Sequence, residues 1–441
     1  MTLLARGVAW FSLYVLLVMA PAAVAVVVDP FAERRPAFVE TSVSLGFFAF
    51  TLILVQFALV SRLRTSSRPF GTDALMQFHR YMGFVALVLV VIHPVLLNIS
   101  GLPWSMWVPL PTNAEARSGA IALWAIVALV VTTVLRQRLH LSYEVWRSIH
   151  LALSIVAAAA MVTHILVVNG YSRHGAMRTL LAAYLLGFAA VLLTYRLVRP
   201  VRLLWRPWTV ISNVDEGAST RTIRVRPVGH QGFAFDPGQF AWLITGASPF
   251  SLQQHPLSIS SSAERAPDGS VDFSVKALGD WSSVVVPALA PGTRVWVDGA
   301  FGAFTTEAKA AQGFVLIAGG IGIAPIRSML QTMRDREDRR HVILLYAARN
   351  ETRAPFREEL ERLREHLNLD IAYVFEEPPQ DWTGERGYLT TAVLKRHLPA
   401  HFRRYHYFVC GPLPMIDAVE GMLVEVGVAP RSIDSERFNV V

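Results

Sequence analysis

The chain has 441 residues, of which 53% are hydrophobic and only 17% are charged. A soluble domain carries about 25% charged residues, so part of this chain is expected to lie in lipid. The apolar content excludes intrinsic disorder, and a single cysteine excludes a disulfide scaffold. The net charge of +8 does not indicate a nucleic-acid partner, because many basic residues flank long apolar runs, as in membrane proteins.

Six apolar stretches occupy the first 200 residues, at 8–28, 41–60, 76–98, 119–135, 146–168 and 178–195. Each has about the 20 residues that an α-helix needs to cross the hydrocarbon layer. The first is either a retained helix or a cleaved signal peptide, and its long apolar run favours the retained helix. We therefore predict an all-α, six-helix membrane domain over residues 1–200.

Arginines between the stretches predict the orientation. With the N-terminus inside, the inner segments hold eleven arginines and the outer segments hold five. Because basic residues accumulate on the cytoplasmic side, everything after residue 200 is expected in the cytoplasm.

Four histidines lie inside the apolar stretches. His79 and His93 share the third stretch, His150 and His164 share the fifth, and both pairs are 14 positions apart. Fourteen residues bring two side chains within about 40° on one helix face, about 21 Å apart along the axis. The third and fifth helices run in the same direction, so His79 is expected beside His150 and His93 beside His164.

Two imidazoles at each of two depths predict two bis-histidine haem sites. An imidazole in hydrocarbon is costly without a partner, and haem iron with its apolar macrocycle supplies one. The alternative is a set of hydrogen bonds within the bundle, but the matched spacing favours haem. His140 and His174 lie in loops and are interpreted as solvent-side residues.

The sequence changes character near residue 205, where charges, glycine and proline return. Strand-like segments at 222–226 and 240–244 flank the turn Asp236-Pro237-Gly238. Beyond residue 312, a strand at 314–318, a glycine turn, a helix at 325–334 and a strand at 341–346 are typical of a parallel α/β sheet. We predict a strand-rich domain over residues 205–305 and an α/β domain over residues 312–441.

Two segments of the strand-rich domain are candidates for flavin binding. In His255-Pro256-Leu257-Ser258-Ile259-Ser260, small hydroxyl residues and a proline let a planar ring and a ribityl chain approach the backbone. The segment Lys276-Ala277-Leu278-Gly279-Asp280-Trp281-Ser282 predicts a strand, a turn and a helix start with Asp280 as N-cap. Such a helix start holds a pyrophosphate, and a capped surface helix is the alternative.

The α/β domain has three candidate nucleotide-binding features. The turn Gly319-Gly320-Ile321-Gly322-Ile323-Ala324-Pro325 lets a dinucleotide phosphate lie against the backbone, although it lacks the full G-x-G-x-x-G pattern. Arg349 follows the next strand, where a cation pairs with a 2′-phosphate and favours NADPH over NADH; a solvated arginine is the alternative. Cys410-Gly411-Pro412 ends a later strand, at a position typical of a ligand crevice, and a small buried side chain at Cys410 is the alternative.

Together these motifs resemble the NADPH oxidase and ferric reductase superfamily, from the third apolar stretch to the end of the chain. The resemblance implies two haems b, held by His79 with His150 and by His93 with His164. It also implies a ferredoxin-reductase-like module, with an antiparallel flavin barrel before the nucleotide domain. FAD is then bound by the segments at 255–260 and 276–282, and NADPH by those at 319–325 and 410–412. The sequence departs from the family at Leu257-Ser258 for Phe-Thr, Lys276 for Arg, and Ala324 for Thr.

In such proteins a near-terminal aromatic residue covers the flavin ring and moves aside for nicotinamide. The resemblance assigns this place to Phe438, with Glu436 nearby, although three residues follow Phe438. Cys410, Glu436 and Phe438 are therefore the candidate residues at the hydride-transfer site. Without a recognisable calcium-binding extension, the chain resembles a minimal bacterial core, expected in the bacterial inner membrane with its dehydrogenase in the cytoplasm.

The expected activity is electron transfer from NADPH through FAD, which converts hydride chemistry into single-electron steps, and through both haems to an outer acceptor. Dioxygen, giving superoxide, is favoured over a ferric chelate, and Arg117, Arg173 and His174 in the outer loops attract a small anion. An electron-transfer subunit that serves a periplasmic protein is the alternative from another class. NADH in place of NADPH, the oligomeric state and regulation stay open.

Overall fold

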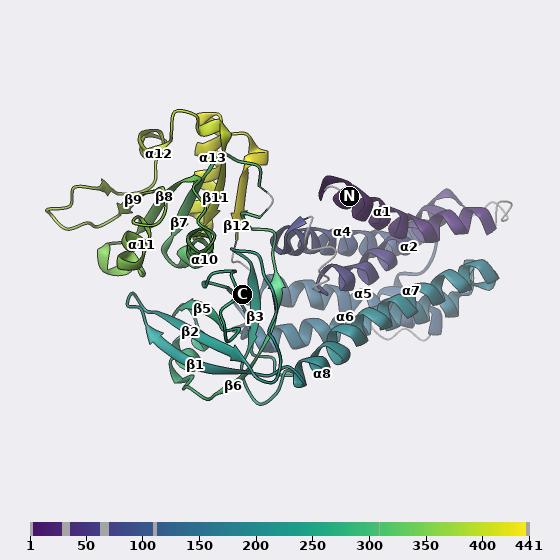
Figure 1. The fold of residues 1–441 in the computed structure, drawn as a ribbon. Coiled ribbons are helices and arrows are strands. Elements are labelled where there is room, and N and C mark those ends of the chain that lie inside the picture. The colour runs from purple at the N-terminus through teal and green to yellow at the C-terminus, as the bar shows by residue number, and fades with distance from the viewer. Residues whose placement is uncertain (1–2, 29–35, 62–69, 109–112, 308, 438–441) are drawn as a thin grey trace. The chain divides into compact units, whose positions relative to one another are not determined.

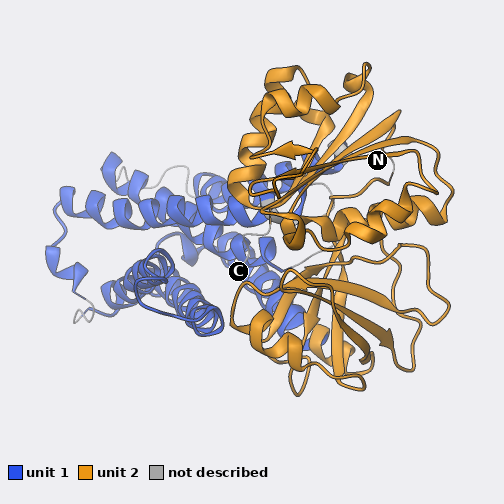
Figure 2. Ribbon diagram, turned by 90° about the vertical axis from the view of Figure 1, so that its left-hand side faces the viewer, with its two compact units in different colours: residues 1–198 blue, residues 199–441 orange. Residues whose placement is uncertain are grey.

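The computed structural model describes residues 3–28, 36–61, 70–108, 113–307 and 309–437. The chain divides into two compact units, residues 1–198 and 199–441, which are coloured blue and orange in Figure 2. The first unit is helical, and the second contains two sheets of different type (Figure 1).

The long helices of the first unit are α1 (Leu3–Val28), α2 (Ala37–Leu59), α4 (Thr72–Ile99), α5 (Ala114–Val134), α6 (Tyr143–Val168) and α7 (Gly175–Leu193), with short turns η1 (Trp104–Trp107), η2 (Tyr171–Arg173) and η3 (Thr194–Val198). Within the described ranges, six helices are long and apolar enough to cross a membrane, which confirms the six predicted spans. The helices begin three to five residues earlier than the apolar stretches. Helix α5, for example, is capped by Asn113, whose side chain accepts from the Glu115 N–H at 2.8 Å.

The helices pack in pairs, α4 along α2 and α6 along α5. Small residues are buried at these contacts, among them Ala49, Ala86, Ala122 and Ala157. Such residues let helix backbones approach closely in a membrane. The histidine-bearing helices α4 and α6 are thus each supported by a partner helix.

The second unit begins with α8 (Arg199–Leu204) and an antiparallel sheet. Its strands are β1 (Trp208–Asp215), β2 (Thr220–Pro227), β3 (Phe240–Ile244), β4 (Gln254–Ser258), β5 (Val271–Lys276) and β6 (Arg294–Phe301), in the order β4-β3-β6-β1-β2-β5. A bridge between Ile259 and Phe273 joins the two outer edges, so the sheet closes into a barrel around a core that includes Trp208, Ile223 and Leu243. The helical turn η4 (Trp281–Val285) and α9 (Val286–Ala288) follow β5.

A parallel sheet makes up the rest of the unit, in the order β10-β9-β8-β7-β11-β12. Its elements are β7 (Gly313–Gly319), η5 (Gly320–Gly322), α10 (Ile323–Asp335), β8 (His341–Ala348), η6 (Glu351–Arg353), α11 (Arg357–Leu363), β9 (Leu369–Phe375), β10 (Glu385–Arg386), α12 (Thr391–His397), η7 (Phe402–Arg404), β11 (Tyr405–Cys410), α13 (Leu413–Val426), η8 (Pro430–Ser432) and β12 (Ile433–Glu436). In β7, Phe314 and Leu316 pack with α10 and α11, whereas Val315 and Ile317 pack with α12 and α13. Helices therefore cover both faces, and the predicted antiparallel barrel and parallel α/β domain are both confirmed.

The parallel sheet reverses its direction of growth between β7 and β11. These strands are neighbours, although β8, β9 and β10 lie between them in sequence. Ligands of open α/β sheets bind outside the carboxyl ends of the strands at such a switch point. Here the two chain turns interlock, because a Cβ atom at Gly322 would lie 2.1 Å from the Cys410 carbonyl oxygen. Only glycine fits at position 322.

This contact predicts that Gly322→Ala destabilises the second unit by about 1–3 kcal/mol, the usual range for overpacking. Thermal unfolding of the detergent-solubilised chain, followed by circular dichroism, measures the change. Gly421→Ala on α13 is the matched control, because a Cβ atom there meets nothing within 4 Å. Equal stability of the two variants would contradict the interlocked turns.

Candidate functional site

Two pairs of histidine rings face each other in the membrane unit. The ring centroids of His79 and His150 are 6.2 Å apart, and those of His93 and His164 are also 6.2 Å apart. A ligating imidazole nitrogen lies about 2.0 Å from its metal, with the ring centroid about 1.1 Å further back, so two axial imidazoles have centroids about 6.2 Å apart. Both pairs therefore have the spacing of two ligands to one iron.

The Nδ1 atom of each ring is held by the neighbouring helix. On α4, His79 Nδ1 lies 2.8 Å from Gln56 Oε1 and His93 Nδ1 lies 2.7 Å from the Ser42 carbonyl oxygen, both on α2. On α6, His150 Nδ1 lies 3.3 Å from Thr133 Oγ1 and His164 Nδ1 lies 2.9 Å from the Glu115 carbonyl oxygen, both on α5. Each histidine thus has its own partner on an adjacent helix.

These partners act as hydrogen-bond acceptors, which assigns the tautomers. Carbonyl and amide oxygens only accept, and the Thr133 hydroxyl already donates to the Leu129 carbonyl at 2.7 Å. Each Nδ1 therefore carries the hydrogen, which leaves the lone pair on Nε2, on the far side of the ring. A hydrogen bond from the second ring nitrogen is what fixes the orientation of metal-ligating histidines. The four residues fit axial ligation of two haems.

Two glycines give the outer rings room against the partner helices. A Cβ atom at Gly46 would lie 3.3 Å from the His93 ring, and one at Gly119 would lie 3.1 Å from the His164 ring. Sequence reasoning missed these glycines and the Nδ1 partners. One signal was available, since Ser42 and Gln56 are 14 positions apart, the same spacing as His79 and His93 on the helix beside them.

The two predicted flavin segments meet in the barrel. The His255 ring on β4 stacks on the Trp281 ring of η4, with centroids 3.9 Å apart and planes 20° apart. The Trp281 indole N–H also donates to Thr245 Oγ1 at 3.0 Å. Of the other residues in the first segment, Ser258, Ile259 and Ser260 are buried and Pro256 and Leu257 are half-buried.

The Ser260 side chain is hydrogen-bonded within the barrel wall. Its hydroxyl accepts from Ser274 Oγ at 2.8 Å, and Ser274 Oγ lies 3.2 Å from Thr222 Oγ1. A flavin at this segment would meet the Ser260 backbone rather than its hydroxyl. The Ser260 hydroxyl therefore belongs to the hydrogen bonds of the barrel wall.

The prediction that Asp280 caps a helix is wrong. Asp280 has helical backbone angles and makes no side-chain capping bond, and the helix that follows is only the short η4 turn. An N-cap residue needs extended backbone angles to aim its side chain at the first turn. Instead, the Ser282 hydroxyl reaches back from η4 and accepts from the Leu278 and Gly279 N–H groups of the preceding turn, at 2.9 and 3.0 Å.

The glycine turn lies beside the cation of Lys276. Gly320 has a φ of +53°, and its carbonyl accepts from the Tyr346 hydroxyl at 3.2 Å. Lys276, at the end of β5, places its Nζ atom 3.6 Å from the position of a Cβ on Gly320. Burial lowers the pKa of Lys276, and the Arg353 guanidinium lowers it further. A segment assigned to the flavin thus also supplies a positive charge to the nucleotide turn.

The remaining nucleotide-binding candidates line up at the carboxyl edge of the sheet. Cys410 is paired with Ala318 of β7 on one side and with Glu436 of β12 on the other. Cys410 and Glu436 are both buried, and Cys410 belongs to the apolar core under α10. The buried side chains of Ile323, Ala324 and Pro325 anchor the first turn of α10. Phe438 lies outside the described residues.

Arg349 directly follows β8 and is exposed. Its guanidinium donates two hydrogen bonds of 3.0 Å to the Glu377 carboxylate, which follows β9. The bond from Arg349 lowers the pKa of Glu377, so the carboxylate is ionised at neutral pH. A 2′-phosphate at Arg349 would therefore have to displace Glu377.

Comparisons with known proteins agree with this division of the chain. Residues 45–161 match the family described as a ferric reductase like transmembrane component, residues 217–305 match an FAD-binding domain, and residues 316–421 match an oxidoreductase NAD-binding domain. The chain has the architecture of ferric reductases and NADPH oxidases. The six apolar helices and these three matches indicate a multi-pass membrane protein with an FAD-binding and an NAD-binding domain.

Individual relatives match up to about half of the chain. NADH-cytochrome b5 reductase 1 of Debaryomyces hansenii is 36% identical over 139 residues, which are 31% of this chain and 49% of that protein. The xylene/toluene monooxygenase electron transfer component of Pseudomonas putida is 31% identical over 226 residues, 49% of this chain and 61% of that protein. The chain thus spans about half to three-fifths of these relatives. The flavohem-like FAD/NAD binding domain of a Vibrio cholerae nitric oxide dioxygenase is 20% identical, with a TM-score of 0.47 over 53% of this chain and 98% of that one.

The position of Lys276 predicts that Lys276→Met weakens binding of NAD(P)H more than binding of FAD. Loss of a charge-assisted contact to phosphate raises the KM for the nucleotide about ten- to a hundredfold. Steady-state kinetics and the FAD content per chain separate the two effects. Lys395→Met, on the exposed surface of α12, is the control and leaves both unchanged. Loss of FAD with an unaltered KM would assign Lys276 to the flavin alone.

Proposed function

We propose that this oxidoreductase moves electrons from cytosolic NADPH through FAD and two bis-histidine haems b to dioxygen on the outer face, giving superoxide. The observation that carries the proposal is the pair of 6.2 Å histidine contacts between α4 and α6. The 14-residue spacing within each helix places the pairs at two depths, about 21 Å apart. The arginine bias of the loops supports a cytoplasmic position for the dehydrogenase, and the bacterial inner membrane is proposed from the resemblance alone.

In the membrane unit, the proposed role of the protein is to hold two haems and to orient the histidine nitrogen atoms that bind them. When bound, each haem supplies a site that takes and gives single electrons. His79 with His150 would hold the inner one and His93 with His164 the outer one, through Nε2 atoms oriented by the Nδ1 hydrogen bonds to α2 and α5. With one imidazole held on each side of the outer haem, an acceptor would have to react at the edge of that haem.

In the dehydrogenase unit, the side chains position two ligands side by side. His255 and Trp281 form a flat aromatic platform next to the half-buried Pro256 and Leu257, where FAD is expected. Lys276 places positive charge beside Gly320 of the Gly319–Gly322 turn, where the phosphates of NADPH are expected. Phe438 and the buried pair Cys410 and Glu436 are proposed to border the hydride-transfer site.

A second candidate function is ferric-chelate reduction. The match of residues 45–161 to the ferric reductase like transmembrane family favours it, and it uses the same route through the chain. An electron-transfer subunit for a periplasmic protein is a third outcome of the acceptor test.

Haem content tests the ligand assignment. Because His93 and His164 form the outer pair, His93→Leu is expected to halve the haem per chain, measured as the pyridine haemochrome of the purified protein. His174→Leu, at the N-terminus of α7, is the control and keeps the full content. A colourless wild-type protein, or a His93→Leu variant with unchanged haem, would rule out the proposed ligands.

Acceptor-resolved turnover then separates the three outcomes. Purified protein with FAD and NADPH is expected to reduce cytochrome c in a reaction that superoxide dismutase abolishes. Reduction of a ferric chelate without oxygen consumption would instead identify a ferric reductase. Haems that stay reduced in air would identify a subunit that needs a protein acceptor.

The ion pair at Arg349 makes a prediction about the coenzyme. Arg349→Ala is expected to raise the KM for NADPH about tenfold and to leave the KM for NADH unchanged, because only NADPH carries the 2′-phosphate. Glu377→Gln, which removes the competing carboxylate, is expected to lower the KM for NADPH. Steady-state kinetics with both nucleotides measures this, and an unchanged preference in Arg349→Ala would reject the assignment of Arg349.

A further inference from the structure

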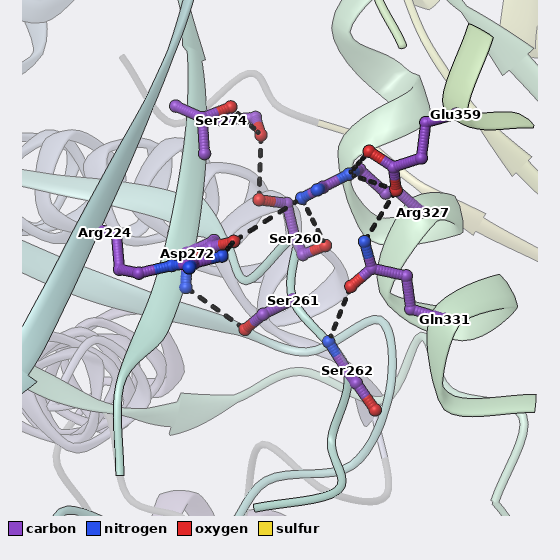
Figure 3. Close-up of polar contacts among 10 residues, drawn as sticks. Arg224, Ser260, Ser261, Ser262, Asp272, Ser274, Arg327, Gln331 and Glu359 are labelled. Carbon is purple, nitrogen blue, oxygen red and sulfur yellow. Dashed lines mark hydrogen bonds and ion pairs between the residues drawn. The ribbon is translucent and has the colours of Figure 1, made fainter. Parts of the chain in front are cut away.

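Helix α10 is bound to the flavin barrel by three polar side chains on one of its faces. Arg327 Nη1 donates to the Ser260 carbonyl at 3.0 Å. Gln331 Oε1 accepts from the Ser262 N–H at 3.0 Å, and Thr332 Oγ1 accepts from the Ala263 N–H at 2.8 Å. All three bonds reach main-chain atoms of residues 260–263, at the end of the predicted flavin segment. Figure 3 shows the bonds of Arg327 and Gln331.

Arg327 is the central member of this contact. It is only 8% exposed, and its Nε donates to both oxygens of Glu359 on α11, at 2.9 and 3.0 Å. On the barrel side, its Nη1 lies 3.8 Å from Asp272 Oδ2. Figure 3 shows the guanidinium between Glu359 on one side and Ser260 with Asp272 on the other. A buried cation with partners in two domains fastens those domains together.

The barrel side of the contact is rigid. Asp272 is 2% exposed and receives two hydrogen bonds from Arg224, at 2.6 and 2.8 Å. The Ser260 N–H donates to the Asp272 carbonyl at 2.8 Å, next to the bridge that closes the barrel. Arg327 therefore binds the barrel next to the bridge that closes it, at main-chain atoms that are held by hydrogen bonds.

The nucleotide turn lies at the N-terminus of the same helix. Gly322 and Arg327 are five positions apart, about 7.5 Å along a helix axis. Gly322 is in turn wedged against the Cys410 carbonyl. The flavin segment and the nucleotide turn are thus joined by a short path of buried and hydrogen-bonded groups. Hydride transfer needs reacting atoms about 3–3.5 Å apart, and a misplacement of about 1 Å costs about a hundredfold in rate.

We infer that Arg327 is a positioning residue that sets the distance between nicotinamide and flavin by fastening α10 to Ser260. The inference rests on the hydride step of the proposed function and is independent of the haem sites. Arg327 is not proposed to touch FAD or NADPH. It acts through the main chain of the flavin segment. Its removal should slow the chemical step more than it weakens either ligand.

The test uses the full-length chain loaded with FAD and mixed with NADPH without oxygen, with the bleaching of flavin absorbance followed by stopped flow. Arg327→Met is expected to lower the limiting rate of flavin reduction about a hundredfold, with less than about a threefold change in apparent Kd for NADPH. Arg327→Lys restores part of the rate, because an ammonium can donate to Ser260 but cannot bind Glu359 through a planar fork as well. Arg334→Met is the matched control, since Arg334 lies on α10 and pairs with its neighbour Asp335.

An isotope measurement separates positioning from damage to the fold. With NADPH deuterated at the transferred position, Arg327→Met is expected to show a full kinetic isotope effect on flavin reduction. A merely structural role would instead lower the FAD content and leave the rate per bound flavin unchanged, which would overturn the inference. If Arg327→Met does not hold FAD, Gln331→Met provides the test, because it removes the neighbouring bond to Ser262. This variant is expected to slow flavin reduction about tenfold. A wild-type rate of flavin reduction in Gln331→Met would also overturn the inference. A wild-type flavin that NADPH does not reduce would refute the proposed hydride step itself.

Discussion

Polar groups buried in apolar surroundings need hydrogen-bond partners, and both units of this protein are organised around that constraint. In the membrane unit, four imidazoles lie among apolar helices, and each is satisfied at Nδ1 by a group on the adjacent helix. Satisfying Nδ1 directs Nε2 away from the partner helix, into the space between α4 and α6. The same bonds that make the histidines tolerable in the bundle therefore make them available as ligands.

The second unit meets the same constraint with a buried charge. Arg327 is satisfied by Glu359 from its own domain and by Ser260 from the barrel. Removing one partner of a buried ionic contact leaves an uncompensated charge, which is strongly destabilising. Such a contact therefore constrains the relative position of the two domains more strictly than apolar packing alone. It lies between the two segments to which FAD and NAD(P)H binding are assigned.

Close backbone packing adds a second constraint at the switch point. Gly322 lies against the Cys410 carbonyl, and a Cβ atom at Gly411 would lie 3.0 Å from the Gly319 Cα. Two motifs that are about 90 residues apart in sequence thus form one surface at the carboxyl edge of the sheet. The glycines at this edge are accounted for by the approach of one chain turn to another.

Periodicity and composition determined much of this protein from sequence alone. Helix number, the shared face of His79 and His93, and the change from antiparallel to parallel strands all follow from local patterns, since the period of apolar residues reflects which face is buried. Side-chain partners did not follow, because they depend on contacts across elements. Asp280 was predicted as a cap, which its helical backbone angles exclude. The pairing of Arg349 with Glu377 after β9 and the position of Lys276 beside Gly320 were not predicted. Tertiary structure alone decided these contacts, because electrostatic and hydrogen-bonding interactions act over a few ångströms in space and leave no fixed spacing in the chain.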